Sequence, residues 1–361
     1  MTRVHAGAVP GRSDDGLSRG EHLGQPLRFR VRHRTVYRYA VPTLRVLGLI
    51  RLKPRPAPGQ TLAAFQMRLA PGGGRLEEHV DAFGNPCALC EWSQPQVELV
   101  LDVAFDLLRW RGDDSLIAST PLAEFPGLLD RVWATSGGGL AVRGRSPVVD
   151  EAAEDRLDAM LYAVETGRMG EGQAVLAALG LDDLALTACG RLGGASQAFA
   201  GPSAREQWTV QMLADVLATR IPEHFAYVPG ATTVETSIDE LLHSRAGVCQ
   251  DFAHLAVAAA RAAGVPARYV SGYIETQPPP GQERLRGVDA THAWASLYDP
   301  ALGWIDIDPT NAARCDERHL TLAWGRGYPD VAPVSGVFQG GMPAGLEVSV
   351  DVERLRETMR A

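Results

Sequence analysis

The first structural signal in the chain is a strict alternation of apolar and polar positions over residues 28–39. Arginines fill most of the polar positions, which are those of one face of an extended strand. A period of two is typical of a β-strand with one buried face, so we interpret the arginines as its solvent-exposed face. Further runs of strand-forming residues, bounded by turn residues, follow at 46–52, 61–69, 87–92 and 97–107. These runs predict an antiparallel β domain over residues 27–108.

The segments on either side of this domain have different patterns. Residues 1–26 are rich in glycine, serine, aspartate and arginine and have no apolar period, which predicts a mobile leader. After the β domain the period becomes helical, and glycine-rich breaks divide the pattern into short pieces. We therefore predict a helical linker or insertion over residues 109–202, in which the part from 125 to 202 has no evident role.

The last part of the chain mixes helical and strand patterns. Ser203 and Glu206 have the spacing of a capping box and predict a helix that runs to about Arg220. Two more helices are predicted, a short one after Ser237 and an alanine-rich one over 250–263. Strands are predicted at 268–274, 292–298, 304–308 and 346–352. The pattern gives an α+β core over residues 203–352 and a short tail over 353–361.

Composition narrows the class of protein. The chain has 361 residues, of which 45% are hydrophobic and 22% charged, so it is long enough for two ordinary folded domains. A net charge of −8 with interspersed signs argues against a nucleic-acid partner. An odd count of five cysteines fits a reducing compartment, and neither a membrane span nor a secretory signal is evident. These features predict a cytoplasmic protein with no membrane association.

Three residues in the core region have the chemistry of thiol catalysis. Cys249 opens the alanine-rich helix, and a helix N-terminus favours a thiolate and presents unpaired N–H groups to an oxyanion. His292 begins one predicted strand, where it can serve as a base. Asp308 ends the next strand and can orient the histidine ring.

Each of these residues also has an ordinary structural interpretation. A cysteine in an alanine-rich helix is often a buried filler, a histidine on a strand can be a satisfied core residue, and an aspartate before Pro-Thr is commonly a turn residue. The ordered set of three makes a coincidence of such roles improbable. We therefore interpret Cys249, His292 and Asp308 as a nucleophile, a base and an orienter.

The sequence around these residues resembles the transglutaminase-like superfamily, in particular its bacterial members with two domains. The resemblance in the core is carried by segments 247–255, 264–273, 289–294 and 303–311, with weaker matches at 225–232, 325–331 and 336–338. Segments 33–39, 52–55 and 81–85 resemble the N-terminal β domain of the same proteins. The resemblance covers residues 28–352 except for the helical segment.

The resemblance implies a papain-like transglutaminase core over residues 203–352, in which a cysteine helix packs on an antiparallel sheet. It places Cys249, His292 and Asp308 at the nucleophile, base and orienter of the family. Asp306, two residues before Asp308 on the same strand, is the rival orienter, but the Asp-Pro-Thr context favours Asp308.

The resemblance also indicates residues around the nucleophile and two departures from the family pattern. Tyr227, Gln250 and Trp294 are candidates for the oxyanion site or the cleft. The segment from 125 to 202 is longer than the family linker usually is, and Gly327 stands where the family commonly has an aspartate, as Gly-Arg-Asp-Tyr. His254, five residues after Cys249, is interpreted as structural rather than catalytic because it lies on another side of the helix.

The function that follows is thiol-dependent acyl transfer on peptide or amide bonds, with hydrolysis preferred and no cofactor or metal. Protein-glutamine transamidation, as crosslinking or deamidation, remains an alternative because the family covers both outcomes. A non-catalytic module that binds peptides or proteins is an alternative from another class. The expected partner is a peptide or protein substrate, with room for a dedicated protein encoded in the same operon, and the oligomeric state stays open.

Overall fold

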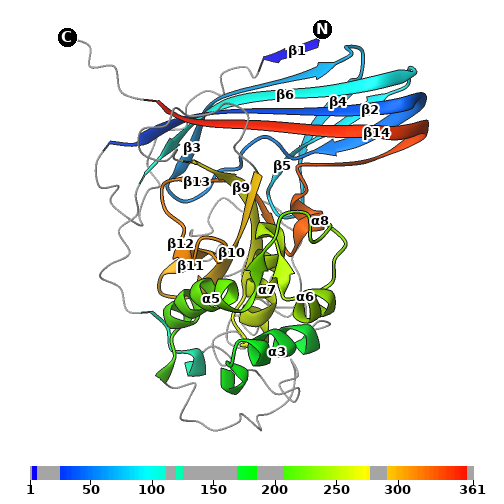
Figure 1. The fold of residues 1–361 in the computed structure, drawn as a ribbon. Helices are drawn as coiled ribbons and strands as arrows, with labels where there is room; N and C mark the ends of the chain where they lie inside the picture. Colours follow the sequence, from blue (N-terminus) through cyan, green and yellow to red (C-terminus); the bar gives the residue numbers. More distant parts are fainter. Residues whose placement is uncertain are drawn as a thin grey trace, which may run out of the picture.

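The computed structural model describes residues 2–5, 25–110, 119–124, 169–184, 207–276 and 291–355. Figure 1 shows these residues as a large β-sheet lying across one end of a core of helices and a smaller sheet. The expected α+β class is therefore confirmed, with antiparallel strands in both sheets.

The large sheet contains the predicted β domain. Its strands have the order β1-β3-β6-β2-β5-β4, and β14 pairs with β2 outside this path. Their bounds are β1 Thr2–His5, β2 Leu27–Ile50, β3 Gln60–Ala70, β4 Arg75–Val80, β5 Pro86–Trp92, β6 Gln96–Arg109 and β14 Val334–Leu355. Residues 2–5 of the expected leader are thus a strand, which pairs with the edge of β3, and residues 6–24 lie outside the described part.

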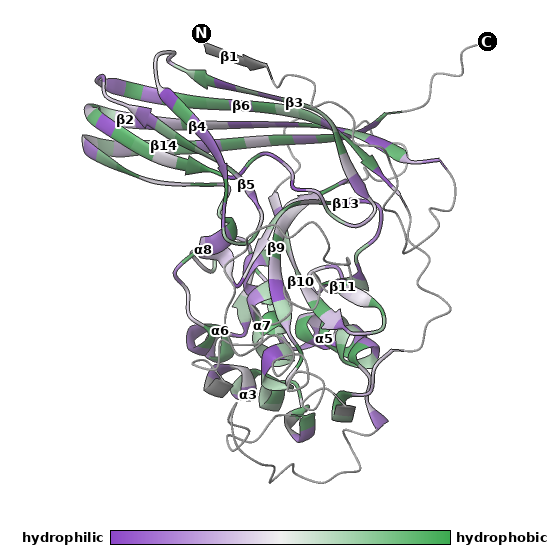
Figure 2. Ribbon diagram, turned by 180° about the vertical axis from the view of Figure 1, so that it is seen from behind, coloured by the Kyte–Doolittle hydropathy of each residue, from purple (hydrophilic) through white to green (hydrophobic). Residues whose placement is uncertain are grey.

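The alternation over residues 28–39 is borne out by the burial of β2. Phe29 and Val31 are fully buried, while arginines occupy the opposite face. That face is paired as well as solvated, because Arg30 donates to both carboxylate oxygens of Asp106 and Arg34 donates to Asp102. Figure 2 shows the same alternation of hydrophilic and hydrophobic residues along the long strands.

The prediction of two strands, at 28–39 and 46–52, is wrong, because β2 is one continuous strand from Leu27 to Ile50. The sequence suggests a break near Pro42, since proline cannot donate to a strand ladder. In the structure Pro42 is exposed and lies where the pairing of β2 with β6 shifts register. The strand β14 continues to pair with β2 on its other side, which carries the chain through this point.

The last strand does not belong to the core as the boundary at residue 352 assumes. The predicted strand 346–352 is part of β14, which runs antiparallel to almost the whole length of β2. Val350 and Val352 are buried in the apolar cluster of the β domain. The end of the described chain therefore returns to the first domain, as Figure 1 shows.

The core is built around helix α7, Cys249–Ala262, which packs against β9 and β10 of a five-stranded sheet. The strand order is β12-β11-β10-β9-β13. The strands are β9 Ala267–Ile274, β10 Thr291–Asp299, β11 Gly303–Asp308, β12 Ala313–Arg314 and β13 His319–Gly325. Two short parallel strands precede α7: β7 Ala226–Tyr227 and β8 Ala246–Gly247. Three predicted strands are therefore confirmed, and β13 is an element that the sequence patterns did not predict.

The other helices surround α7. They are α3 Met169–Ala178, α5 Val210–His224, α6 Ile238–Ser244 and α8 Tyr328–Val331, with short 3-10 turns η1 Leu122–Glu124 and η3 Asp182–Leu184. Helix α6 begins at the predicted Ser237, which forms a capping box with Glu240. Helix α5 begins later than predicted, with Thr209 as its N-cap, and Ser203 and Glu206 lie outside the described residues.

Two large apolar clusters and a small one, around Val270, Trp294 and Trp324, hold the described residues together. One large cluster lies between α7, its neighbouring helices and the small sheet. The other large cluster lies inside the β domain and includes Tyr273, Leu320 and Leu322 from the core, so the two domains share it. No helix among the described residues is long and apolar enough to cross a membrane.

Candidate active site

Cys249 is the first residue of α7, as the sequence predicts. The backbone N–H groups of Asp251 and Phe252 donate to the carbonyl oxygen of Val248, which closes the first helical turn. Helix geometry leaves the N–H of Cys249 without an intrahelical partner. The thiol therefore lies beside a backbone donor at the positive end of the helix dipole.

The first turn of α7 is fixed by Asp251, which is fully buried. Its carboxylate accepts from the N–H of Val248 at 2.7 Å and from the hydroxyl of Thr232 at 2.5 Å. Gly247 is required just before the turn, since a Cβ there would lie 2.8 Å from the Cβ of Asp251. The small residue and the buried carboxylate together fix the backbone that presents Cys249.

His292 and Asp308 are brought together by strands β10 and β11, which pair antiparallel. The Nε2 atom of His292 lies 2.7 Å from Oδ2 of Asp308. Because Nε2 is engaged with the carboxylate, Nδ1 is the ring nitrogen that remains for the thiol of Cys249. Asp306, the rival orienter, forms no bond to His292 in the described part of the chain.

The protonation of His292 is set by opposing effects. Burial lowers the pKa of the imidazole, but the hydrogen bond to Asp308, a hydrogen bond to Cys249 and the charges of both groups raise the pKa to about 9. Burial likewise raises the pKa of Asp308, but hydrogen bonds from His292 and His319 hold it well below its usual range. At neutral pH the pair is therefore an imidazolium and a carboxylate.

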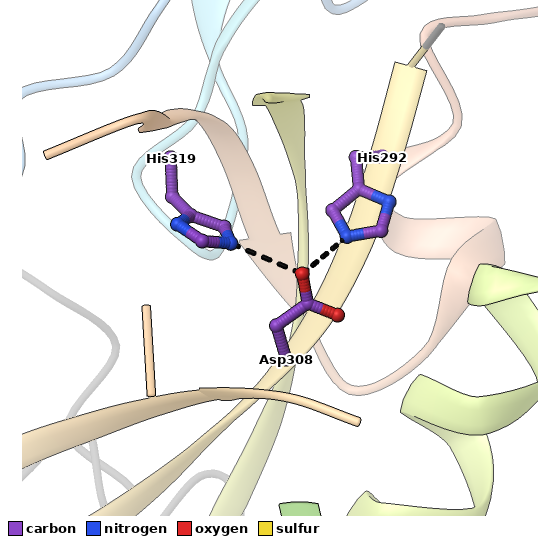
Figure 3. Close-up of side chains that lie close together, drawn as sticks. All are labelled: His292, Asp308 and His319. Atoms are coloured by element: carbon purple, nitrogen blue, oxygen red, sulfur yellow. Dashed lines mark hydrogen bonds and ion pairs between the residues drawn. The ribbon is translucent and has the colours of Figure 1, made fainter. Parts of the chain in front are cut away.

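Asp308 accepts hydrogen bonds from more groups than His292 of the predicted triad. Figure 3 shows two of these partners, His292 and His319. The N–H groups of Thr310 and Asn311 donate to Oδ1 at 2.9 and 3.2 Å. The side-chain amide of Asn311 donates to Oδ2 at 2.6 Å, and Nε2 of His319 lies 3.1 Å from the same oxygen. These contacts leave the carboxylate little freedom to rotate.

His319 is a site residue that the sequence patterns did not identify. It is 1% exposed and begins β13, and its other ring nitrogen contacts Asp316 at 3.1 Å. The resembling segments 303–311 and 325–331 end before it and begin after it, so no quoted segment included this histidine. An isolated histidine gives no signal of its partner until the strands are paired.

The remaining candidates lie in different places. Tyr227 lies on β7 and is 52% exposed. Burial is the main cause that raises the pKa of its hydroxyl, and the charge of Cys249 is the second cause, so the hydroxyl lies near the thiol. The side chain of Gln250 donates to the carbonyl oxygen of Thr233 at 3.0 Å, so its amide is engaged with the backbone. Trp294 is fully buried and packs edge-on against His319, so it is not exposed to a substrate.

His254 of α7 lies close to Gly327, which precedes α8. Nε2 of His254 accepts from the N–H of Tyr328 at 3.2 Å, and its ring packs on Tyr269. Gly327 has extended backbone, and a Cβ there would lie 3.6 Å from Nε2 of His254. The side chain that the family commonly has at this position would thus face His254.

His292, Asp308 and His319 are also the residues, among those described, whose donor atoms lie close enough together to hold a metal. Their nitrogen–oxygen separations of 2.7 and 3.1 Å are those of hydrogen bonds. His319 is engaged with Asp316 on its other nitrogen, and the carboxylate of Asp308 already accepts hydrogen bonds from both rings. The arrangement therefore fits proton transfer and orientation by hydrogen bonds.

Two family models match the chain. The one described as the transglutaminase-like superfamily matches residues 197–309, which contain Cys249, His292 and Asp308. The one described as the bacterial transglutaminase-like N-terminal region matches residues 29–107. The second range coincides with the predicted β domain.

Relatives are found at full and partial length. An uncharacterized protein of Mycobacterium tuberculosis is 34% identical over 350 residues, covering 93% of this chain and 97% of its own. A protein-glutamine gamma-glutamyltransferase of Pseudomonas aeruginosa is 36% identical over 129 residues, covering 34% of this chain and 19% of its own. A solved structure from Cytophaga hutchinsonii, provisionally described as a cysteine protease, covers 93% of both chains with a TM-score of 0.59 and 16% identity, which shows a shared fold.

Proposed function

Since the chain belongs to the transglutaminase-like superfamily and carries the bacterial transglutaminase-like N-terminal region, we propose that it is a thiol enzyme that cleaves amide bonds through Cys249. The observation that carries this proposal is the bond between His292 and Asp308, together with the hydrogen bond between the same imidazole and the thiol of Cys249. A pure binding protein has no need of a buried carboxylate that raises the pKa of a histidine next to a thiol.

The proposed reaction begins with attack of the Cys249 thiolate on the carbonyl carbon of an amide. The C–N bond breaks, and Nδ1 of His292 gives its proton to the leaving amine, which produces a thioester on Cys249. The N–H of Cys249 can stabilise the oxyanion of the tetrahedral intermediate. Asp308 holds the ring throughout by its bond to Nε2.

In the second half-reaction a water molecule attacks the thioester, with His292 accepting its proton. The C–S bond breaks, a carboxylic acid leaves, and the Cys249 thiolate and the His292 imidazolium are restored. We favour water as the acceptor, which makes the protein a cysteine peptidase or amidase. The triad itself sets no limit on which nucleophile enters.

Transamidation is the second candidate, and the similarity to the Pseudomonas aeruginosa glutamyltransferase favours it. In that outcome a primary amine replaces water and a new amide forms. Incubating the protein with a glutamine-containing protein and a fluorescent primary amine distinguishes the outcomes. Hydrolysis predicts release of ammonia or peptide fragments without incorporated amine, whereas transamidation predicts incorporation.

The direct test of the proposal is the variant Cys249→Ala. We expect it to lose all amide-cleaving and amine-transfer activity, because no other group in the site can form the thioester. Cys315 is partly buried and burial raises the pKa of its thiol, so Cys315→Ala provides a matched control that should keep the activity. Full activity of Cys249→Ala would contradict the proposal, and peptide binding without turnover would favour a binding module.

A further inference from the structure

His319 donates a hydrogen bond to Asp308 in either of the protonation states that fit its surroundings. If the ring is neutral with its proton on Nε2, Nδ1 can accept from the N–H of Asp316, which lies 3.0 Å away. If the ring is charged, Nδ1 can donate to the Asp316 carboxylate at 3.1 Å. In both states Nε2 donates to the Asp308 oxygen that also holds His292.

The strand that carries His319 lies at the edge of the small sheet, and its outer edge is bound by the β domain. Gln60 bonds the backbone of Thr321 twice: its amide donates to the carbonyl oxygen at 2.8 Å and its side-chain oxygen accepts from the N–H at 2.9 Å. Asn85 bonds the backbone of Trp324 in the same way, at 2.9 and 3.0 Å. These two amides satisfy backbone groups that an edge strand would otherwise leave unpaired.

Arg55 connects the two amides to the same strand. Its backbone N–H donates to the carbonyl oxygen of Leu322 at 3.1 Å, and its guanidinium donates to the side chain of Asn85 at 2.8 Å. The guanidinium also stacks on Trp324, with its carbon 3.2 Å from the ring centroid. Arg55, Gln60 and Asn85 are each less than 9% exposed, so these bonds are shielded from water.

Arg55 and Asn85 belong to the N-terminal segments 52–55 and 81–85, whose role the chemistry of the triad leaves unexplained, and Gln60 begins β3. Asn85 is held in turn by Asp81, which accepts from its N–H and its side chain. The β domain thus presents a rigid set of polar groups to β13. Its contact with the core is specific to the backbone of one strand and does not depend on apolar packing alone.

We propose that the N-terminal β domain positions Asp308, by holding the outer edge of β13 so that His319 donates to the carboxylate that orients His292. His319, Gln60 and Asn85 are positioning residues in this proposal, which rests on the proposed function of the Cys249 site. A small displacement of a group that orients a reacting residue is enough to slow a reaction by orders of magnitude. The β domain is then part of the machinery that activates the thiol.

The test uses the rate at which iodoacetamide alkylates Cys249 at pH 6 in the full chain, read by peptide mass spectrometry. We expect His319→Leu to slow alkylation by at least about tenfold, because Oδ2 of Asp308 then loses one of the donors that hold it beside His292. His319→Gln retains an N–H donor near the position of Nε2, and we expect its rate to remain within about threefold of the wild-type rate. Rescue by the donor separates positioning from loss of packing.

A second pair of variants tests the β domain. Gln60→Met preserves size but removes both bonds to Thr321, and we expect it to slow alkylation by about threefold to tenfold. Met67→Ala, in the apolar cluster of the β domain, removes buried side-chain volume but no hydrogen bond to β13. The rates are compared at a temperature where thermal melting shows all variants to be folded, and Met67→Ala should react at the wild-type rate.

The outcomes separate this proposal from the function on which it rests. Slow alkylation of the wild type would overturn the proposed function, and this inference with it. Rapid alkylation of the wild type with unchanged rates in folded His319→Leu and Gln60→Met would overturn this inference alone. A loss in His319→Leu that His319→Gln does not repair would also overturn it, because the hydrogen bond would then be irrelevant.

Discussion

Asp308 receives hydrogen bonds on both carboxylate oxygens, and this single residue decides the charge of the site. Backbone N–H groups bind Oδ1, and side chains that include His292 and His319 bind Oδ2. A buried carboxylate held this way stays ionised and raises the pKa of the imidazole that it contacts. The sequence predicts Cys249, His292 and Asp308 because each lies in a local motif, whereas His319 depends on a contact between strands.

The first prediction concerns the pH dependence set by Asp308. The pKa of His292 is about 9 in the folded protein, against an ordinary value of 6.5 in the unfolded chain. The folded state therefore binds the proton more tightly. The resulting stabilisation is complete below pH 6.5 and is lost as the pH rises through 9. In Asp308→Asn we expect this loss to disappear and the basic limb of the pH–turnover profile to move down from about 9.

The measurement is thermal unfolding of wild type and Asp308→Asn between pH 6 and 10. As the pH rises from 6 to 10, the difference in unfolding free energy between wild type and Asp308→Asn should narrow by up to about 3 kcal/mol. Asp306→Asn, on the same strand, provides the control and should follow the wild-type profile. Parallel profiles for Asp308→Asn and wild type would show that this carboxylate does not set the pKa of His292.

At the scale of elements, one helix end and the register of three strands assemble the site. Helix α7 and strands β10 and β11 could be predicted from the sequence, because apolar periods and turn residues mark their ends. The continuity of β2 and the existence of β13 could not. Pro42 resembles a break in β2. In β13 a register shift hides the alternation of the strand.

The second prediction concerns Gly272 of β9, which pairs with His292 on one side and Thr321 on the other. A Cβ there would lie 2.3 Å from the carbonyl oxygen of Leu320 and 2.4 Å from the ring of Trp294. We expect Gly272→Ala to lower the unfolding free energy by about 1–3 kcal/mol, because the sheet beneath His292 must shift. It should also slow the alkylation of Cys249.

Chemical denaturation and the alkylation assay together measure this effect. Gly345→Ala in β14 provides the control, since a Cβ there has nothing within 4 Å. Unchanged stability and reactivity in Gly272→Ala would mean that the register around His292 tolerates displacement.

At the scale of the molecule, the β domain and the core are joined by a shared apolar cluster and by polar contacts. The return of β14 to β2 makes the large sheet discontinuous in sequence, and such pairing of distant segments leaves no local pattern to read. Alternation predicts that residues 346–352 form a strand, but it cannot say which sheet the strand joins. The placement of the β domain against β13 was hidden for the same reason.

The third prediction concerns a titratable contact between the domains. His33 of β2 is 3% exposed, and its Nδ1 lies 2.9 Å from the hydroxyl of Tyr273 in β9. Burial lowers the pKa of His33 to about 4, so the fold favours the neutral ring. The contribution of the neutral His33 ring to the unfolding free energy is fully present above pH 6.5, the ordinary pKa of histidine. It is lost as the pH falls toward 4.

In His33→Gln this acid dependence should be absent, because the amide does not titrate. Between pH 6.5 and 4, we expect the unfolding free energy of wild type to fall by up to about 3 kcal/mol more than that of His33→Gln. Urea denaturation across this pH range measures the difference. His79→Gln, at an exposed position of β4, should behave as wild type, and an unchanged slope in His33→Gln would contradict the role of His33.

The central claim is that His292, held by Asp308, activates Cys249. The most direct measurement is the rate of Cys249 alkylation by iodoacetamide from pH 5 to 9 in wild type and His292→Ala. At pH 6 an ordinary thiol is almost entirely protonated, so we predict that wild type reacts about a hundredfold faster than His292→Ala. Equal rates in the two proteins, rising together only near pH 8.5 as for a free thiol, would contradict the account.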